Sequence, residues 1–472
     1  MTLPMTAFPI MGQPDTGDTA WMLASSALVL LMTPGLAFFY GGMVRSKNVL
    51  NMIMMSTVAM GVVTVLWSIY GFSESFGNSE GGLFGSFGQY FGLKGLIQGN
   101  ASAAVAATKT SPAVAAVNLP VIGTAPDYIP TLVFVAFQLM FAIITVALVS
   151  GAIADRLKFG SWVAFTALWA TFVYFPVAHW VFAFDGTTGE HGGWIANKLK
   201  AIDFAGGTAV HINSGAAGLA LALVLGARKG WPKAAMRPHN LPFVMLGSGL
   251  LWFGWYGFNA GSALTSGGDA ASTFITTTIA TGAAMLGWLL VEKLVDGHAT
   301  SLGAASGVVA GLVAITPSCS SVNVLGALAI GFITSVVCAF AIRLKYKLKY
   351  DDALDVVGVH MIGGLMGTLL VGFFLCPQSP AATSGLFANT KGLFYGGGLD
   401  QLWRQAVGGF SVMAYSFVAT LIIALVIKYT IGLRMSDEEQ AEGADETQHA
   451  ETAYDITSGS GAGSGLSVST KV

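Results

Sequence analysis

The chain has 472 residues, of which 54% are hydrophobic and only 10% are charged, and its formal net charge is −2. Because soluble domains carry roughly 25% charged residues, this composition excludes a soluble globular protein. The near-neutral charge, without a basic patch, gives no reason to expect a nucleic-acid partner. The three cysteines, Cys319, Cys338 and Cys376, are too few and too scattered for a disulfide framework or a zinc site, so we expect no metal.

A helix needs roughly 20 apolar residues to cross the hydrocarbon core of a bilayer. Eleven stretches of about this length lack Asp, Glu, Lys and Arg. They lie at residues 21–42, 48–72, 128–153, 159–182, 204–226, 241–263, 271–291, 298–316, 322–342, 356–376 and 406–427. The chain is therefore predicted to be an all-α membrane protein with eleven transmembrane helices, of which 298–316 is the shortest.

The loop charges predict an orientation with the N-terminus outside and the C-terminus in the cytoplasm. The inner side would then carry Arg45, Lys47, Arg156, Lys158, Arg228, Lys229, Lys233, Arg237, Lys293, Arg343, Lys345, Lys347, Lys349, Lys428 and Arg434. The outer side would carry only Lys94, Lys109, Lys198, Lys200, Lys391 and Arg404. This asymmetry follows the positive-inside rule of cell-membrane proteins.

The remaining chain divides into an outer loop and a tail. Residues 75–127 are rich in Gly, Ala and Ser and are predicted to be mostly irregular. Residues 1–434 would form the transmembrane domain and residues 435–472 a cytoplasmic tail. The tail begins with an acidic segment and ends, from Thr457, in a low-complexity sequence that is expected to be flexible. The acidic segment is expected to dock under the basic inner face of the bundle, up to about Tyr454, and to modulate transport. The alternative is a solvated tail without contacts.

Two histidines, His211 and His360, lie inside the fifth and tenth predicted spans, and each begins the pattern His-x-x-x-Gly-x-x-Gly. Ionisable groups are costly in hydrocarbon and are therefore candidates for function. A block of five helices ends on the opposite side of the membrane from where it begins. A second block of five, helices 6–10, would therefore repeat helices 1–5 in inverted orientation, and helix eleven would follow. Inverted repeats build transport sites near the membrane midplane. The alternative is two unrelated core histidines bonded to backbone carbonyls.

Several motifs resemble the ammonium transporters, the Amt branch of the Amt/Mep/Rh family, over nearly the whole chain. They are Phe38-Phe-Tyr-Gly-Gly42 with Arg45-Ser-Lys-Asn48, Asp203-Phe-Ala-Gly-Gly-Thr-Ala-Val-His211-Ile-Asn, Pro238-His-Asn-Leu-Pro242, Gly254-Trp-Tyr-Gly-Phe258-Asn-Ala-Gly-Ser262 and Asp355-Val-Val-Gly-Val-His360. The resemblance implies transport of ammonium or ammonia, one pore per subunit, a homotrimer and contact of the tail with PII-type signalling proteins. It implies no cofactor and no enzymatic activity.

The resemblance also assigns parts to individual residues. Ser262, Phe141 and Phe182 would form the outer ammonium site, although the family usually has Trp at the position of Phe182. Phe141 and Phe258 would form a stacked gate, and Trp180 is expected to point elsewhere. The expected supporting residues are Asp203, Gln138, Asn259 and Asp355, with Asp203 and Asp355 capping the helices that carry the two histidines. No role in conduction is assigned to His179, His191, His239 and His298.

A full cation at the bilayer centre is disfavoured by at least about 2.5–3.5 kcal/mol. Ammonium would therefore lose a proton and cross the pore as ammonia past His211 and His360. A proton relay through the two imidazoles would make net transport electrogenic. One alternative is an ammonium sensor that signals through its tail, against which the lack of an appended output domain argues. A second alternative is a membrane redox enzyme with the two histidines as haem ligands.

Overall fold

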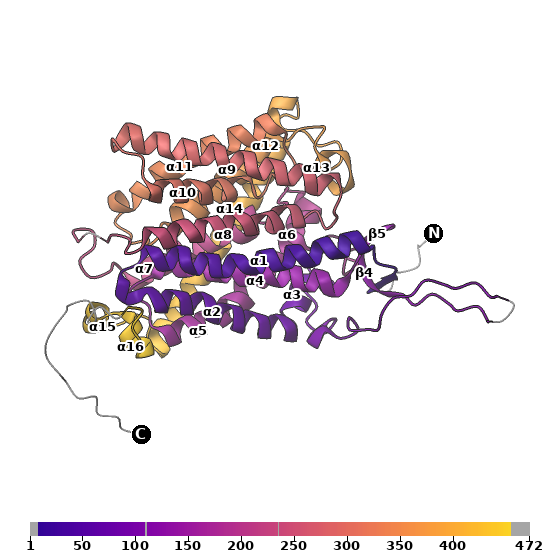
Figure 1. The fold of residues 1–472 in the computed structure, drawn as a ribbon, viewed down its shortest axis with the longest axis horizontal. Helices are drawn as coiled ribbons and strands as arrows, with labels where there is room; N and C mark the ends of the chain where they lie inside the picture. Colours follow the sequence, from indigo (N-terminus) through magenta and orange to yellow (C-terminus); the bar gives the residue numbers. More distant parts are fainter. Residues whose placement is uncertain (1–7, 109–110, 235, 455–472) are drawn as a thin grey trace, which may run out of the picture.

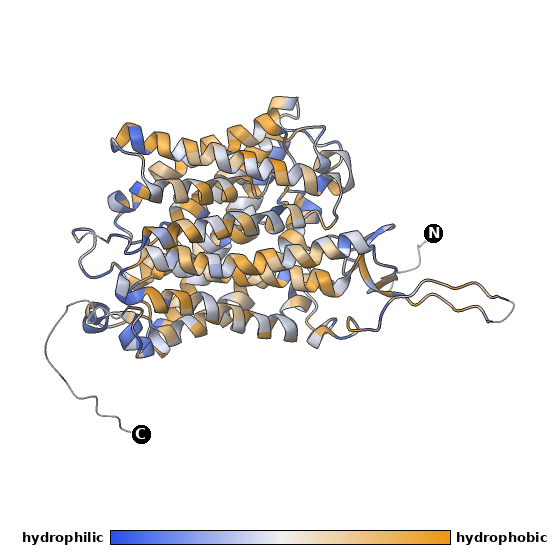
Figure 2. Ribbon diagram, in the orientation of Figure 1, coloured by the Kyte–Doolittle hydropathy of each residue, from blue (hydrophilic) through white to orange (hydrophobic). Residues whose placement is uncertain are grey.

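The computed structural model describes residues 8–108, 111–234 and 236–454, and they form a bundle of roughly parallel helices (Figure 1). In this part of the chain ten helices are long and apolar enough to span a bilayer, and an eleventh, Ser301–Ile315, is shorter. The prediction of an eleven-helix membrane protein is confirmed. Figure 2 shows that the helix bodies are mainly hydrophobic and that hydrophilic residues gather at the two ends of the bundle.

The spans combine α-helices with short π-helical segments. In chain order they are α1 (Thr16–Met43); α2 (Val49–Leu66), η2 (Trp67–Gly71) and α3 (Phe72–Phe76); α4 (Thr131–Ile153); α5 (Phe159–Trp169), η4 (Ala170–Tyr174) and α6 (Phe175–Phe182); η6 (Gly207–Ile212) and α7 (Asn213–Leu225); α8 (Leu241–Gly261); α9 (Gly268–Val295); α10 (Ser301–Ile315); α11 (Val324–Leu348); η7 (Val357–Met361) and α12 (Ile362–Phe374); and α14 (Asp400–Thr430). The shorter helices are η1 (Ser46–Asn48), η3 (Phe91–Leu93), η5 (Ile195–Leu199), α13 (Pro380–Thr383), η8 (Gly385–Phe387), η9 (Leu393–Tyr395), α15 (Asp437–Glu442) and α16 (Ala444–His449).

Three spans, α1, α9 and α14, begin before the uncharged stretches that predicted them, and α9 starts at Gly268 rather than at residue 271. Helix α1 starts at Thr16 rather than at residue 21, because the Asp15 carboxylate accepts a hydrogen bond from the backbone N–H of Asp18 at 2.8 Å. Helix α14 likewise starts at Asp400 rather than at residue 406. Acidic side chains in the first turn of a helix are favoured by its dipole. The charges therefore lie inside these helices and do not mark their ends.

Helix α10 is shorter than the other spans, and non-helical backbone continues from its C-terminal end. Residues 316–322 follow it without helical structure, and all of them are buried. Non-helical backbone is tolerated at membrane depth only where protein surrounds it or a cavity adjoins it. This turn places Thr316 and Pro317 beside the central helices, where they contact residues of the candidate site.

A small sheet covers the end of the bundle opposite to the tail (Figure 1). Strand β4 (Leu119–Thr124) pairs antiparallel with β1 (Ile10–Gly12) on one side and with β5 (Asp127–Pro130) on the other. A second pair joins β2 (Ser79–Glu80) to β3 (Phe84–Gly85). The sequence analysis expects the loop at 75–127 to be mostly irregular, and these short strands are an addition to the predicted all-α architecture.

The first part of the tail packs against one end of α2 and α5. The side of the bundle that carries the tail is here called the inner side, and the opposite side the outer side, after the orientation that the loop charges predict. The Asp445 carboxylate accepts hydrogen bonds from the N–H groups of Leu50 at 3.1 Å and Asn51 at 2.8 Å, at the start of α2. The backbone N–H of Ala444 donates to the Asn48 side chain at 2.7 Å. The ring of His449 packs edge to face on Phe159, with centroids 4.6 Å apart. Helices α15 and α16 are thus held by specific contacts, and residues 455–472 lie outside the described residues.

Candidate transport pathway

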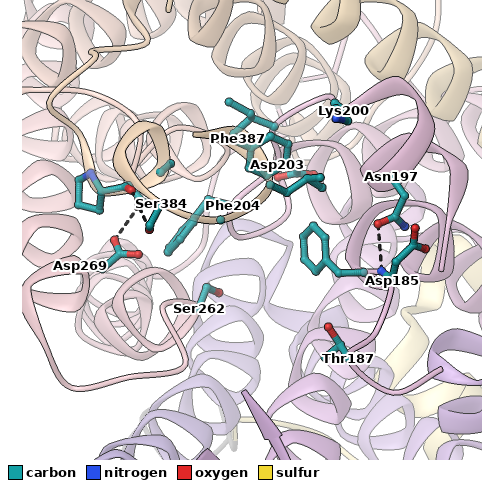
Figure 3. Close-up of a pocket in the computed structure, with 17 residues that line it drawn as sticks. Asp185, Thr187, Asn197, Lys200, Asp203, Phe204, Ser262, Asp269, Ser384 and Phe387 are labelled. Atoms are coloured by element: carbon teal, nitrogen blue, oxygen red, sulfur yellow. Dashed lines mark hydrogen bonds between the residues drawn. The ribbon is translucent and has the colours of Figure 1, made fainter. Parts of the chain in front are cut away.

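A cavity of about 640 Å³ lies at the outer end of α8 (Figure 3). Its lining includes Ser262, Phe204 and Asp203. Among the described residues that line it, the charged groups are Asp185, Asp203, Asp269 and Lys200. A cleft with an excess of carboxylates raises the local concentration of cations. The Ser262 hydroxyl donates to the carbonyl of Phe258 at 2.8 Å, which leaves its oxygen lone pairs free to accept a hydrogen bond.

Two aromatic rings lie one helical turn below Ser262. Phe141 and Phe258 stack with centroids 4.1 Å apart and planes at 21°, and both are buried. Phe182 lies edge-on to Phe141 at 6.4 Å. The structure thus brings together the three phenylalanines that the sequence analysis names, with Phe182 in contact with the stacked pair.

Trp180 lies away from these rings, as the sequence analysis expects. Its indole N–H donates to the carbonyl of Leu83 at 2.7 Å, and its ring packs on Tyr415 with centroids 4.7 Å apart. Trp180 therefore does not place an indole beside the stacked phenylalanines in place of the tryptophan that the family usually has at position 182.

The two histidines meet directly below the stacked rings. The Nδ1 atoms of His211 and His360 are 3.2 Å apart, and the ring centroids are 5.3 Å apart. The His211 ring also lies 6.1 Å from the ring of Phe258, so the histidine pair is contiguous with the stacked phenylalanines. Its Nε2 atom is buried and has no hydrogen-bond partner among the described residues. A buried polar atom without a protein partner indicates a position for water or a ligand.

The space around the two imidazoles is narrow and otherwise apolar. Its lining, apart from the histidines, is Met32, Leu36, Phe39, Ile144, Leu148, Val210, Leu251, Trp255, Phe258 and Val309. The volume open to the centre of a water-sized molecule is about 10 Å³, which is room for about one such molecule. A haem macrocycle does not fit here, so the haem interpretation has no structural support.

Trp255 is part of the site, although the sequence analysis gives it no role. It stacks on His211 with centroids 5.4 Å apart and planes at 19°. Its indole N–H donates to the Thr316 hydroxyl at 2.9 Å, and Thr316 in turn contacts the Asn259 side chain at 3.3 Å. Asn259 therefore lies in this network and not on the cavity surface. Trp255 precedes Phe258 by three residues, and that helical spacing could have identified it.

Asp203 caps the helix of His211. Its carboxylate accepts hydrogen bonds from four backbone N–H groups, those of Gly206, Gly207, Thr208 and Ala209, at 2.7–3.1 Å. These contacts occupy both oxygens, which supports the interpretation of Asp203 as a structural cap.

The expectation that Asp355 caps the helix of His360 is wrong. The cap is Asp352, whose carboxylate accepts from the N–H groups of Val356 at 3.1 Å and Val357 at 2.7 Å. Asp355 instead pairs with Lys345 at 2.6 Å. Asp352 precedes His360 by eight residues, as Asp203 precedes His211. The correspondence between the two halves of the inverted repeat could therefore have identified Asp352 as the cap.

Two other polar groups lie outside the pathway. Gln138 is buried, does not line either of the two cavities, and its Oε1 atom has no hydrogen-bond partner among the described residues. His179 is buried between α3 and α6, where its ring nitrogens contact the Ser75 carbonyl at 3.0 Å and the Ser79 hydroxyl at 2.9 Å. His179 thus has partners for both nitrogens and no contact with the cavities.

A buried charge cluster lies at the inner end of the bundle. Arg228 binds Asp351 through two hydrogen bonds of 2.9 Å from its guanidinium, and its Nη1 lies 3.4 Å from Asp155. Asp155 also accepts a hydrogen bond from Asn48, which contacts the tail. Burial raises the pKa of Asp351, but the hydrogen bonds and charge of Arg228 outweigh that effect and hold the pKa below its ordinary value. The cluster therefore links the segments that follow α4, α7 and α11 to Asn48 at the start of α2.

These features define a class of protein: a multi-pass membrane transporter with an acidic outer cavity, an aromatic constriction and a narrow apolar path past two imidazoles. Comparison with known proteins identifies the family. A sequence model of the Ammonium Transporter Family matches residues 20–454. The chain is 68% identical to an ammonium transporter of Mycobacterium tuberculosis over 97% of this chain and 94% of that protein.

Solved structures agree with this assignment. The crystal structure of Saccharomyces cerevisiae Mep2 is 31% identical, covers 95% of this chain and 93% of its own, and has a TM-score of 0.78. A structure described as a sensor Amt protein is 28% identical over 93% of this chain and 98% of its own, also with a TM-score of 0.78. The chain belongs to the ammonium transporter family, and its substrate is ammonium or ammonia.

Proposed function

We propose that ammonium is recruited at the outer cavity and gives up its proton at the stacked phenylalanines, the proton passing to the imidazole pair while neutral ammonia crosses past His211 and His360. The contact between the two imidazoles inside a dry, narrow passage carries this proposal. An imidazole pair supplies hydrogen bonds to a neutral molecule that has left its hydration shell. A full cation at the same depth would face a penalty of at least about 2.5–3.5 kcal/mol.

The contact between the imidazoles determines how protons are arranged. Two Nδ1 atoms at 3.2 Å form a hydrogen bond only if one carries a proton and the other accepts it. In neutral rings, the donor at Nδ1 then has an unprotonated Nε2, and the acceptor at Nδ1 has a protonated Nε2. The pair would therefore offer ammonia one acceptor and one donor. A proton taken up at the bare Nε2 of one ring, transfer of the shared proton between the Nδ1 atoms and release of a proton from Nε2 of the other ring would move one proton across the pair. Such a relay would make net transport electrogenic.

The outer site would select for ammonium by its chemistry. The Ser262 oxygen accepts an N–H bond, and the faces of Phe141 and Phe182 attract a cation by about 0.5–2 kcal/mol each. Potassium carries no proton to release, so it would be held at the constriction. The negative lining of the cavity supports recruitment of a cation.

Phe182→Trp should tighten the apparent affinity for ammonium by up to about tenfold, because an indole is the better cation–π partner. The edge-on contact of Phe182 with Phe141 supports this position as part of the outer site. The concentration dependence of methylammonium uptake measures the effect, with Phe172→Trp, an exposed position on the same span, as the control. An unchanged or weaker affinity would mean that residue 182 does not face the cation.

The assembly and orientation proposed here follow from charge and resemblance. The N-terminus would lie outside and the C-terminus in the cytoplasm, as the loop charges indicate. We propose a homotrimer with one pore per subunit and a PII-type protein as a partner of the cytoplasmic face. The acidic helices α15 and α16, docked beside Lys47 and Arg45, are part of that face.

The docked tail should modulate transport. Deletion from Ser436 removes the hydrogen bonds of Asp445 and Ala444 to the start of α2 and is expected to change the transport rate without preventing insertion. Deletion from Thr457 leaves these contacts intact and should have no effect, which makes it the matched control. The uptake rates of the two truncations, normalised to protein in the membrane, are compared with that of the full chain. Equal rates would show that the acidic segment has no influence on transport.

Ammonium or methylammonium uptake by cells that lack other transporters tests the proposed function. The sensor alternative predicts binding of ammonium with little flux, and flux above that of untransformed cells therefore separates the two. Absence of uptake by protein that has inserted in the membrane would overturn the proposal in favour of the sensor.

A further inference from the structure

Both histidines lie in π-helical turns. The His211 N–H donates to the Gly206 carbonyl, five residues earlier, at 3.1 Å, and η6 continues in this register to Ile212. The segment η7 contains His360 in the same way, and the Ile362 N–H donates to the Val357 carbonyl. A π-turn inserts a residue into a helix and is frequent at functional sites. Each turn is followed by an ordinary α-helix that carries a glycine four residues after the histidine.

These two glycines each contact the other histidine's helix. A Cβ at Gly215 would overlap the backbone nitrogen of Met361, the residue after His360, and would lie 2.6 Å from its Cβ and 2.7 Å from its Cα. A Cβ at Gly364 would lie 2.8 Å from the carbonyl oxygen of Gly207, 3.0 Å from the Cβ of His211 and 3.1 Å from the backbone nitrogen of Ile212. The two helices therefore cross through a pair of equivalent contacts, one beside each imidazole.

The second glycine of each motif packs elsewhere. A Cβ at Gly218 would meet the Cβ of Ala152 on α4 at 3.0 Å, and one at Gly367 would meet the Cα of Ala314 on α10 at 3.1 Å. Helices α4 and α10 are the third and eighth spans and correspond to each other in the inverted repeat. In each motif the first glycine therefore packs on the opposite half of the repeat. The second packs mainly on its own half, although a Cβ at Gly218 would also lie 3.4 Å from the side chain of Val356.

We propose that Gly215 and Gly364 are positioning residues that set the distance between the two imidazoles and the width of the passage beside them. The inference rests on the proposed function of the pair. The imidazoles contact each other at 3.2 Å, and neither glycine leaves room for a methyl group. An alanine must push the helices apart at the crossing, because the obstructing atoms are backbone and Cβ atoms that cannot rotate away. Backbone obstructs both positions, but the effect should be larger at Gly215, where a Cβ would overlap the Met361 nitrogen, than at Gly364, where the nearest atom would be 2.8 Å away.

The test compares ammonium and methylammonium transport by purified protein in liposomes for Gly215→Ala, Gly364→Ala and two reference variants. Gly61→Ala, on α2, is the matched control, because a Cβ there meets nothing within 4 Å. His211→Ala reports on the proposed function itself. For Gly364→Ala we expect ammonium transport to fall about tenfold, since misplacement of a site by about 1 Å costs up to about 100-fold. The ratio of methylammonium to ammonium rates should rise, because the passage is wider.

The ratio separates positioning from general packing. A fall in rate with a changed ratio in Gly364→Ala, and wild-type behaviour of Gly61→Ala, supports the proposal. Equal losses of both rates with an unchanged ratio, or wild-type behaviour of Gly364→Ala while His211→Ala is defective, overturns it. If His211→Ala behaves as the wild type, the proposed function fails and this inference fails with it. Should Gly215→Ala not insert, the milder Gly364→Ala decides alone.

Discussion

Replacement of His211 or His360 by alanine is expected to abolish ammonium transport or change its selectivity, while the protein still inserts in the membrane. Each variant removes one partner of the 3.2 Å contact and leaves the passage without its donor–acceptor pair. A proton or a cation must then cross without a relay, against a penalty of about 2.5–3.5 kcal/mol, which corresponds to roughly a 100-fold loss of current. Widening of the narrow passage by the lost ring could instead admit other cations.

The current and the uptake of purified protein in liposomes measure both effects. Ammonium, methylammonium and potassium are applied in turn, so a loss of rate and a loss of selectivity are recorded separately. His298→Ala is the control, because His298 is an exposed residue between α9 and α10. Unaltered rate and selectivity in both variants would show that His211 and His360 are not part of the conduction path.

The spans could be predicted from the sequence because charged residues are costly in hydrocarbon and their absence extends over whole helices. The exact ends could not, since the same rule treats Asp18 and Asp400 as boundaries, whereas both lie in the first turn of a helix. The strands β1, β4 and β5 could not be predicted for another reason. Strands of only a few residues are too short to show a clear alternation of apolar and polar side chains.

The inverted repeat could be inferred from two observations, an odd number of helices between the histidines and the shared glycine pattern. The meeting of His211 and His360 at the crossing agrees with that inference. The π-turns could not be predicted, because the register of their hydrogen bonds depends on packing between helices and not on the residues of one turn. The motif Asp355-Val-Val-Gly-Val-His360 pointed to Asp355 as the cap, whereas the spacing of eight residues between Asp203 and His211 corresponds to Asp352 and His360.

Contacts between distant parts of the chain were the least accessible to sequence reasoning. The stacking of Trp255 on His211 brings together residues from the sixth and fifth spans, and Thr316 comes from a third segment. No spacing along one helix contains that information. The position of the docked tail was easier to anticipate, since an acidic segment follows a basic inner face, but its hydrogen bonds to Asn48 and Asn51 depend on the folded arrangement.

The second large effect is expected for Arg228→Met. Arg228 and Asp351 are both buried, and their side chains are bound through two hydrogen bonds of 2.9 Å. Loss of the guanidinium leaves the buried Asp351 carboxylate without its cationic partner, with only the backbone N–H of residue 228 at 2.7 Å, and loss of one partner of a buried ion pair destabilises proteins by about 3–5 kcal/mol. Arg343→Met is the matched control, because its pair with Asp296 is largely exposed and such pairs contribute only about 0–1 kcal/mol.

Thermal unfolding of the purified protein in detergent measures the difference, and pH identifies its cause. In the wild type Arg228 holds the pKa of Asp351 below its ordinary value, whereas in the variant burial raises that pKa. A carboxyl group whose pKa is raised by folding destabilises the protein when ionised, and the penalty is relieved as the pH falls through the raised pKa. The stability deficit of Arg228→Met should therefore shrink on acidification.

The double variant Arg228→Met with Asp351→Leu removes both charges and should recover most of the stability, since apolar replacement of a whole buried pair is often neutral. A deficit that is independent of pH and remains in the double variant would mean that Arg228 stabilises the inner end of the bundle by packing and not by its charge.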